Sequence, residues 1–397
     1  MRVALVHDWL TGMRGGERCL EVFSELFPAA TLYTLLHVAG SVSARIEGMS
    51  IRCSGLNRFP GVARWYRFLL PSFPWFIERH DLRGYDLVLS SSHCVAKGVR
   101  VPEGALHIAY IYTPMRYVWD LYPEYFGPGR AAPVSGAVMA LLRRRLQRWD
   151  VRTAARVDHF VAISQHVADR VRRHYGREAT VIYPPVDTER FQAGDGPGEF
   201  YLVVSAFAPY KRIDLAVQAC NVLRRPLKIV GGGQDERRLR ALAGPTVEFL
   251  GGRSDEEVAD LFRRCRALLF PGVEDFGITP LEAMASGRPV IAYARGGVLE
   301  TVIPLNPSSR EMGGSPMPSN EVPWGSQGPT GVFFSVQSVE GLVGAIELFE
   351  ASLHQFEPKL LRDRALAFDR RVFKEKIAAF VTERWTEHRD RSGQSAC

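Results

Sequence analysis

The chain lacks the patterns that would mark a disulfide-rich, metal-binding or membrane-spanning protein. Its six cysteines, at positions 19, 53, 94, 220, 265 and 397, form no Cys-x-x-Cys pair, which argues against both a zinc site and a disulfide framework. No stretch reaches about 18 consecutive apolar residues, and the apolar run Val3–Val6 is too short for a signal peptide core. We therefore expect a cytoplasmic protein with reduced thiols.

A dinucleotide-binding Gly-x-Gly-x-x-Gly fingerprint is also missing. The glycine run Gly231–Gly233 follows an apolar segment, but Gln234, Asp235 and Glu236 come next, so the fingerprint is not completed. We expect this run, with Gly232 at its centre, to form a tight strand-to-helix turn that lets a nucleotide base approach the backbone.

The overall composition is that of a soluble globular protein with two domains. Of the 397 residues, 46% are hydrophobic and 23% are charged, enough to bury large cores. The formal net charge of +7 favours anionic partners, which include nucleotides, acidic lipid head groups and nucleic acid. We expect no nucleic acid partner, because no aromatic and basic recognition module accompanies the charge.

Apolar strands alternate with amphipathic helices along most of the chain, which predicts an α/β fold with doubly wound parallel sheets. In the first half we expect strands at 2–7, 87–89, 107–112 and 160–163, the last entering a helix capped by Ser164. After a linker that includes Gly194–Gly198, strands are expected at 201–205, 227–230, 247–249, 267–270 and 289–293. The pattern predicts two Rossmann-like domains facing a central cleft.

The most informative motif runs from Glu274 to Glu282, where two carboxylates flank a Phe-Gly turn. The apolar strand before it and the sequence Thr279-Pro280 predict strand, loop and helix, with Thr279 as the N-cap. The start of such a helix offers backbone N–H groups to a phosphate. Thr279 and Glu282 also fit a capping box, in which Glu282 would only bond the N-cap amide.

The spacing of these acids resembles the Glu-x7-Glu signature of the retaining GT-B glycosyltransferases of family GT4. Further similarity lies in Val203–Asp214, Gly287–Ala292 and the pair Gly296-Gly297. The resemblance implies a GT-B fold with domains at 1–190 and 199–370 and a final helix, 371–397, that returns to the first domain. The first domain would face the acceptor and the second would bind the nucleotide sugar.

The resemblance also implies site residues. Glu274, Lys211 and Arg212 are the expected catalytic residues, with Glu274 on the donor sugar and the cations on the diphosphate. Glu282 is expected on the ribose. The remaining expected donor-binding residues are Gly15, Gly16, Gly232, Phe276, Gly277, Ile278 and Thr279. Family members usually carry an Arg where this chain has Ala206, and Arg212 or Tyr210 is expected to substitute for it.

An aromatic segment, Tyr110–Asp120, resembles the Thr-Pro-Met-Arg-Tyr segment of mannosyltransferase-like members that build bacterial surface polysaccharides. Aromatic faces stack on sugars, and Arg or Asp fixes hydroxyls. We expect acceptor or sugar recognition by Tyr112, Arg116, Tyr117 and Asp120. Many members have His where this chain has Tyr112, so a histidine role does not carry over to that position.

Residues 58–80 mix arginines with Trp, Tyr, Phe and Leu. Such a stretch suits a membrane surface, and it equally suits short, partly buried helices broken by prolines. Arg143–Arg145 and Arg148 add positive charge in the same half. His93 and Lys97 follow a predicted strand, at the expected edge of the cleft. His93 has either a structural or a functional role, and Lys97 is either structural or a contact for an acceptor phosphate. We expect residues 304–330 to form a long loop.

Together these observations predict a retaining glycosyltransferase that moves a hexose, with mannose the best guess, from a nucleotide diphosphate sugar to a lipid-linked or saccharide acceptor. The partners would be GDP-mannose, a polyprenyl-diphosphate-linked saccharide and the inner face of the cell membrane. No Asp-x-Asp occurs, so we expect no metal cofactor, with Lys211, Arg212 and backbone amides neutralising the diphosphate. The alternative is a non-catalytic nucleotide-sugar-binding or scaffold protein of the same fold.

Overall fold

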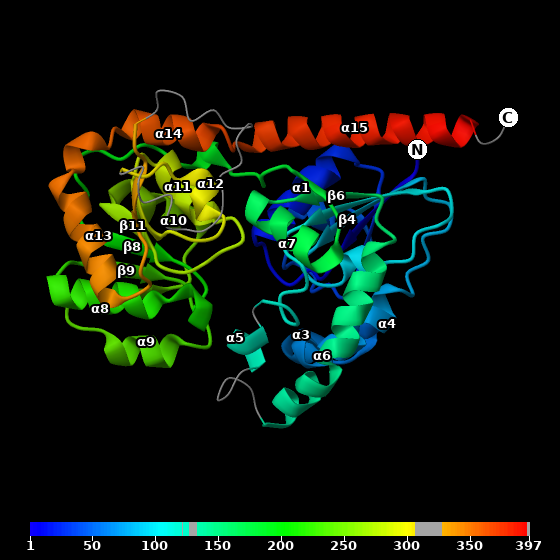
Figure 1. The fold of residues 1–397 in the computed structure, drawn as a ribbon, viewed down its shortest axis with the longest axis horizontal. Coiled ribbons are helices and arrows are strands. Elements are labelled where there is room, and N and C mark those ends of the chain that lie inside the picture. Colours follow the sequence, from blue (N-terminus) through cyan, green and yellow to red (C-terminus); the bar gives the residue numbers. More distant parts are fainter. Residues whose placement is uncertain (121, 127–132, 306–327, 395–397) are drawn as a thin grey trace. The chain divides into compact units, whose positions relative to one another are not determined.

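The computed structural model describes residues 1–120, 122–126, 133–305 and 328–394. The chain divides into two compact units, residues 1–185 with 371–397, and residues 186–370 (Figure 1). Most of the expected loop at 304–330 lies outside the described residues. No described helix is long and apolar enough to cross a bilayer.

The first unit is built on a seven-stranded parallel sheet with the order β3-β2-β1-β4-β5-β6-β7. The strands are β1 Val3–His7, β2 Thr31–Thr34, β3 Ser50–Cys53, β4 Leu87–Ser92, β5 Leu106–Ile111, β6 His159–Ala162 and β7 Ala179–Val181. The strand order reverses between β1 and β4, and such a switch point is where ligands bind α/β sheets, at the carboxyl ends of the strands.

Helices cover this sheet. They are α1 Gly15–Leu26, α2 Ala44–Glu47, α3 Val62–Trp65, α4 Phe73–Ile77, α5 Tyr122–Phe126, α6 Pro133–Ala154, α7 Gln165–Tyr175 and α15 Arg370–Gln394, with short 3₁₀ turns η1 Gly55–Arg58, η2 Tyr66–Ser72 and η3 Ala96–Gly98. The Ser164 side chain accepts the amide of Val167 at 3.0 Å, so the expected cap of α7 is confirmed. The last helix, α15, packs beside α1 through Phe373 and Phe23, whose rings are 5.8 Å apart (Figure 1).

The second unit has a six-stranded parallel sheet with the order β10-β9-β8-β11-β12-β13. The strands are β8 Tyr201–Val204, β9 Leu227–Val230, β10 Val247–Gly251, β11 Ala267–Phe270, β12 Val290–Tyr293 and β13 Gly331–Phe334. Its helices are α8 Ile213–Leu223, α9 Glu236–Leu242, α10 Asp255–Arg264, α11 Ile278–Ala285, α12 Val298–Thr301, α13 Val339–Ala351 and α14 Pro358–Leu366. The strand order reverses between β8 and β11, which places the loops after these strands at the switch point.

The two sheets confirm the predicted α/β class. Four strands were not foreseen: β2, β3, β7 and β13. The edge strands β3 and β7 are half-exposed and short, so neither carries a clear apolar run. The glycine-rich stretch Gly194–Gly198 lies in the second unit, where Arg288 donates to the Gly196 carbonyl at 2.8 Å and the Gly194 amide donates to Ser286 at 3.1 Å.

Candidate functional site

In the second unit, the loops after β8 and β11 bring Lys211 and Glu274 together. The Lys211 ammonium forms an ion pair with a Glu274 carboxylate oxygen, and the two side chains are 14% and 24% exposed. Gly272 permits this contact, because a Cβ there would lie 2.8 Å from the Lys211 Cα and carbonyl oxygen. The two residues expected to act on the donor are therefore neighbours, and both remain accessible.

The helix after Glu274 begins two residues earlier than expected. Helix α11 starts at Ile278 with Gly277 as its N-cap, at φ +88°, so the prediction of Thr279 as N-cap was wrong. The capping box of Thr279 with Glu282 is wrong for the same reason, since Glu282 no longer occupies the third helical position. Glycine fits because a Cβ at residue 277 would press on the Phe270 ring at 3.2 Å. Ile278, Thr279 and Glu282 are half-buried.

Gly296 and Gly297 hold the loop that carries Glu274. The Gly297 amide donates to the Glu274 carbonyl at 2.9 Å. A Cβ on Gly296 would crowd the same carbonyl, and one on Gly297 would collide with the backbone of Phe276. The Phe276 side chain is buried against Phe368, with ring centroids 6.0 Å apart. Phe276 therefore anchors the turn through its side chain.

Arg212 differs from Lys211 in its surroundings. Its side chain donates to Asp214 at 3.2 Å and to Gln337 at 3.4 Å, and its backbone sits at φ +50° as the N-cap of α8. Gln337 in turn donates to the Pro271 carbonyl at 2.9 Å, which ties Arg212 to the loop that leads to Glu274. The structure thus pairs Arg212 with an acid on its own helix.

The turn after β9 is compact, as the run of three glycines predicted. Gly231 and Gly233 adopt φ +129° and +155°, and a Cβ on Gly231 would collide with the Ser205 carbonyl. Gly232 accepts the amide of Phe207 at 2.9 Å and is itself exposed. The chain therefore presents bare backbone at the carboxyl end of β9.

In the first unit, Asp8 organises the loop after β4. Its carboxylate is fully buried and accepts the backbone amides of His93, Cys94, Val95 and Ala96 at 2.6–3.0 Å. The imidazole Nδ1 of His93 also lies 3.1 Å from Asp8. Burial lowers the pKa of His93 to about 4, and the nearby charge of Arg116 adds to this, although Asp8 opposes it. His93 is therefore neutral near pH 7.

A second polar group surrounds Tyr112 at the switch point. The Tyr112 hydroxyl bonds Ser91 at 2.8 Å and donates to the Gly16 carbonyl at 2.9 Å, while His7 Nδ1 bonds Ser91 at 2.9 Å. Glu17 lies 3.7 Å from the other His7 nitrogen. Burial opposes ionisation of Glu17, but the interactions with His7 outweigh it and lower its pKa. Tyr112 therefore links Gly16, in the first turn of α1, to β4. Gly15 and Gly16 thus lie in a helix, so the expectation that they form a loop was wrong.

His7, Asp8, Glu17 and Ser91 were not expected in the site. The signal in the sequence was weak, because a His-Asp pair that ends a buried strand is common. Only the pairing of β1 with β4, His7 opposite Ser91, reveals the cluster.

The other residues expected to recognise sugar take different positions. Arg116 and Tyr117 are half-buried, and Tyr117 packs on the apolar core. Asp120 accepts hydrogen bonds from Arg170 at 2.7 Å and contacts His174 at 3.1 Å. Burial opposes its ionisation, but His174 and Arg170 hold the pKa of Asp120 well below its usual range. Asp120 thus joins the aromatic segment to α7.

Lys97 does not meet an acceptor phosphate. Its ammonium is 1% exposed and lies 2.8 Å from Asp150, and it donates to the Asp150 carbonyl at 2.7 Å. The same carboxylate accepts Trp119 and Tyr175, each at 2.8 Å. This ion pair is a structural element of the core, so the interpretation of Lys97 as a phosphate contact was wrong.

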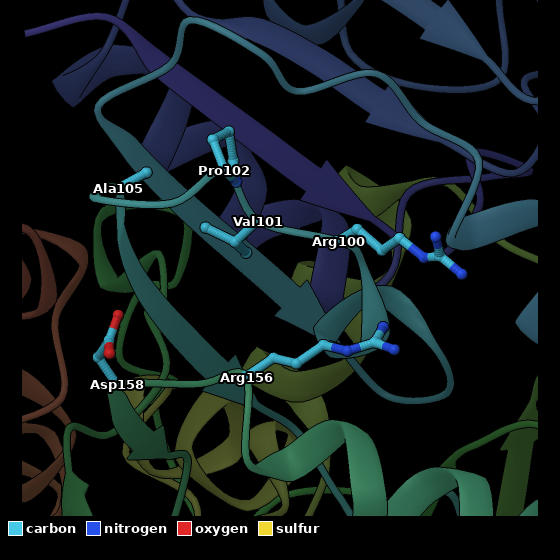
Figure 2. Close-up of a pocket in the computed structure, with 6 residues that line it drawn as sticks. All are labelled: Arg100, Val101, Pro102, Ala105, Arg156 and Asp158. Carbon is cyan, nitrogen blue, oxygen red and sulfur yellow. The ribbon is translucent and has the colours of Figure 1, made fainter.

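A pocket of about 420 Å³ in the first unit lies elsewhere (Figure 2). It is lined by Arg100, Val101, Pro102, Ala105, Arg156 and Asp158. Ala105 and Asp158 precede β5 and β6, so the pocket opens at the amino ends of the strands, away from the ligand-binding edge. Arg156 is paired with Glu78 at 2.9 Å, and Arg100 lies 3.4 Å from the same acid. This pocket is not the candidate site.

The described residues include no group of three or more His, Cys, Asp or Glu side chains arranged to hold a metal ion. Within the same part of the chain the cysteines at 19, 53, 94, 220 and 265 are unbridged. Burial raises the pKa of the Cys19 and Cys265 thiols to about 12. These buried thiols are inert packing groups.

The architecture is that of the GT-B glycosyltransferases. One structure with this fold, the Anabaena protein HepE in complex with UDP, matches 96% of this chain and 100% of its own chain, with a TM-score of 0.67 and 16% sequence identity. At this identity the match concerns the fold alone. The fold class predicted from the resemblance is thereby confirmed.

Two family models then cover most of the chain. Residues 36–190 match Glycosyltransferase Family 4, and residues 186–309 match Glycosyl transferases group 1. The chain therefore belongs to the group 1, family 4 glycosyltransferases.

Among individual relatives, the O-antigen chain mannosyltransferase C of Escherichia coli is 39% identical over 100 residues, 23% of this chain and 27% of the relative. A GDP-mannose-dependent phosphatidylinositol monomannoside mannosyltransferase of Mycobacterium tuberculosis is 36% identical over 172 residues, 35% of this chain and 45% of the relative. The matched segments span less than half the length of these curated relatives.

Proposed function

We propose that the protein transfers a hexose, with mannose the favoured sugar, from a nucleotide diphosphate sugar to a lipid-linked saccharide acceptor, with retention of configuration. The observation that carries the proposal is the contact of Lys211 with Glu274 beside the start of α11. This contact places a cation for the diphosphate and an acid for sugar hydroxyls beside the backbone amides of a helix N-terminus.

The chemistry follows from the charges. As the bond between sugar and phosphate breaks, negative charge grows on the diphosphate, and Lys211 with the α11 amides stabilises it. The acceptor hydroxyl attacks the face that the nucleotide leaves, and its proton passes to the leaving phosphate oxygen. No side-chain base is needed in this scheme, and we propose that no metal is needed either.

Two relatives support mannose as the sugar, because both are named as mannosyltransferases and one as dependent on GDP-mannose. The lipid-linked acceptor rests on the polysaccharide and phospholipid products that their names imply. The base remains open to test, since HepE was solved with UDP.

The test is thermal stabilisation of the purified chain by a panel of nucleotide diphosphates and nucleotide sugars, with and without EDTA. We expect GDP and GDP-mannose to raise the unfolding temperature equally in both conditions. A shift that EDTA abolishes would contradict metal independence, and a shift with uridine nucleotides alone would contradict GDP-mannose.

The second candidate function is a non-catalytic nucleotide-sugar-binding protein, which Ala206 and Tyr112 favour because both depart from the usual residues of the family. Binding without release of nucleotide diphosphate, in the presence of mannosylated lipid acceptors, would support it.

A further inference from the structure

The segment between α2 and β4 in the first unit exposes aromatic side chains among arginines. Phe68 is 75% exposed, Trp75 53% and Phe59 48%. Single exposed apolar residues are ordinary, but here three aromatic side chains are exposed in the stretch of short helices and turns that includes α3 and α4, and Figure 1 shows where these two helices lie in the first unit. Val62, Tyr66 and Phe73, from the same segment, are buried in the core. One side of the segment is therefore anchored in the core, and its exposed side carries the three aromatic rings.

The segment that carries these rings has basic side chains but no acidic ones. The thirty residues 48–77 contain four arginines and no Asp or Glu. Arg58 and Arg64 are exposed, and neither makes an ion pair with an acid in the described part of the chain. Arg67 lies over the Tyr66 ring at 5.7 Å. Because Arg58 and Arg64 form no ion pair within the described residues, an anionic surface outside the unit is their complementary partner.

A pocket of about 320 Å³ opens on the same segment. It is lined by Tyr33, Arg52, Cys53, Ser54, Gly55, Trp75, Phe76, Arg79, His80 and Asp81. The Arg79 guanidinium lies 3.7 Å above the Trp75 ring, and Asp81 is already held by two hydrogen bonds from Arg83, at 2.8 and 2.6 Å.

Two further features of this pocket point to an anion. Arg52 and Arg79 have no acidic partner within ion-pair distance among the described residues. The Nε2 atom of His80 is buried and bonds no described group, and burial lowers the pKa of His80 to about 4, so it is neutral near pH 7. The pocket therefore offers two cations and a neutral imidazole beside an aromatic wall, and the one carboxylate in its lining, that of Asp81, is bonded to Arg83.

We propose that this surface docks the protein on a bilayer that contains anionic phospholipid, with Phe59, Phe68 and Trp75 in the interface and a lipid phosphate in the pocket beside Arg52 and Arg79. Amphipathic segments with aromatics and arginines bind this boundary through both burial and charge. The proposal deepens the proposed function, because a lipid-linked acceptor lies at a bilayer. Its structural evidence comes from the exposed segment and the pocket, and none of it from the Lys211–Glu274 site.

The test is flotation of the full chain with vesicles of phosphatidylcholine alone or mixed with phosphatidylglycerol. We expect binding to the mixed vesicles only, and weaker binding at high salt. Replacing Arg58 and Arg64 together by Gln should weaken binding by about fivefold for each arginine. Phe68→Ser should weaken it by roughly tenfold.

Matched controls lie away from this surface. Val222→Ser changes an exposed apolar residue, 65% exposed, in the second unit. Arg173→Gln changes an exposed arginine on α7. Both should bind vesicles as the parent chain does. Absence of binding to mixed vesicles, or equal losses in the controls, would overturn the proposal.

The pocket has its own test. Replacing both Arg52 and Arg79 by Gln should remove the preference for phosphatidylglycerol while the fold, followed by circular dichroism, is kept. If soluble glycerol phosphate binds in this pocket but leaves flotation of the chain with mixed vesicles unchanged, the pocket takes free phosphate esters and the lipid assignment fails. Stabilisation by nucleotides is measured without vesicles, so failure of docking and failure of the transferase proposal are separate outcomes.

Discussion

Replacing Lys211 by alanine tests the chemistry of the site most directly. The substitution removes the ammonium that pairs with Glu274, at a side chain that is 14% exposed. Removing one preorganised group that stabilises developing negative charge typically slows turnover by 10² to 10³, or about 3–4 kcal/mol of transition-state stabilisation. Because Lys211 is partly shielded from water, we expect a loss within about this range.

Arg212→Ala should cost much less. The Arg212 guanidinium is engaged with Asp214 and Gln337, so part of its charge is already balanced. We expect a loss of about tenfold or less, as for a partly exposed paired charge. Lys228→Ala is the matched control, since Lys228 is also paired with a glutamate, Glu248, at 3.6 Å, but on the strand β9. Its turnover should be unchanged.

The assay measures release of nucleotide diphosphate from the donor that stabilises the chain, at saturating concentration, alongside thermal unfolding of each variant. If Lys211 acts on the leaving group, turnover falls while donor affinity changes less. Unchanged turnover in Lys211→Ala, or a loss fully explained by weaker donor binding, would refute the reasoning.

Three further predictions concern stability. Lys97→Met leaves the buried Asp150 carboxylate without its cation and should lower the free energy of unfolding, measured in urea, by about 3–5 kcal/mol. Adding Asp150→Asn should recover part of this loss. An unchanged urea midpoint in Lys97→Met would contradict a structural ion pair. Burial lowers the pKa of His107 to about 4 from its usual 6.5. The neutral His107 side chain therefore contributes fully to folding stability above pH 6.5, and up to about 3 kcal/mol of the free energy of unfolding is lost as the pH falls toward 4. His107→Gln should make stability depend less steeply on pH in this range, and an equally steep dependence would contradict the role of His107. Gly231→Ala should lower the unfolding temperature and weaken nucleotide binding, because the new Cβ would collide with the Ser205 carbonyl oxygen. In the control Gly252→Ala the new Cβ meets open space, so neither quantity should change. Equal effects of the two variants would argue against the close backbone approach at Gly231.

The sequence by itself determined the fold class and most central strands. Strands such as β1, β4 and β11 are fully buried, and their continuous apolar runs stand out between glycine turns and amphipathic helices. The capping box of Ser254 with Glu257, at 3.2 and 2.8 Å, is also encoded locally, because a cap depends only on residues three positions apart.

Contacts between distant residues were decided by the tertiary structure alone. Thr279 fits an N-cap locally, yet the helix begins at Ile278, because Gly277 turns tightly against Phe270. Three contacts join segments more than fifty residues apart: the buried ion pair of Lys97 with Asp150, the hydrogen bonds of Asp8 to the loop after β4, and the ion pair of Lys211 with Glu274. Periodicity and spacing describe only local neighbours, whereas these contacts depend on which strands pair and on how closely glycine lets one backbone approach another.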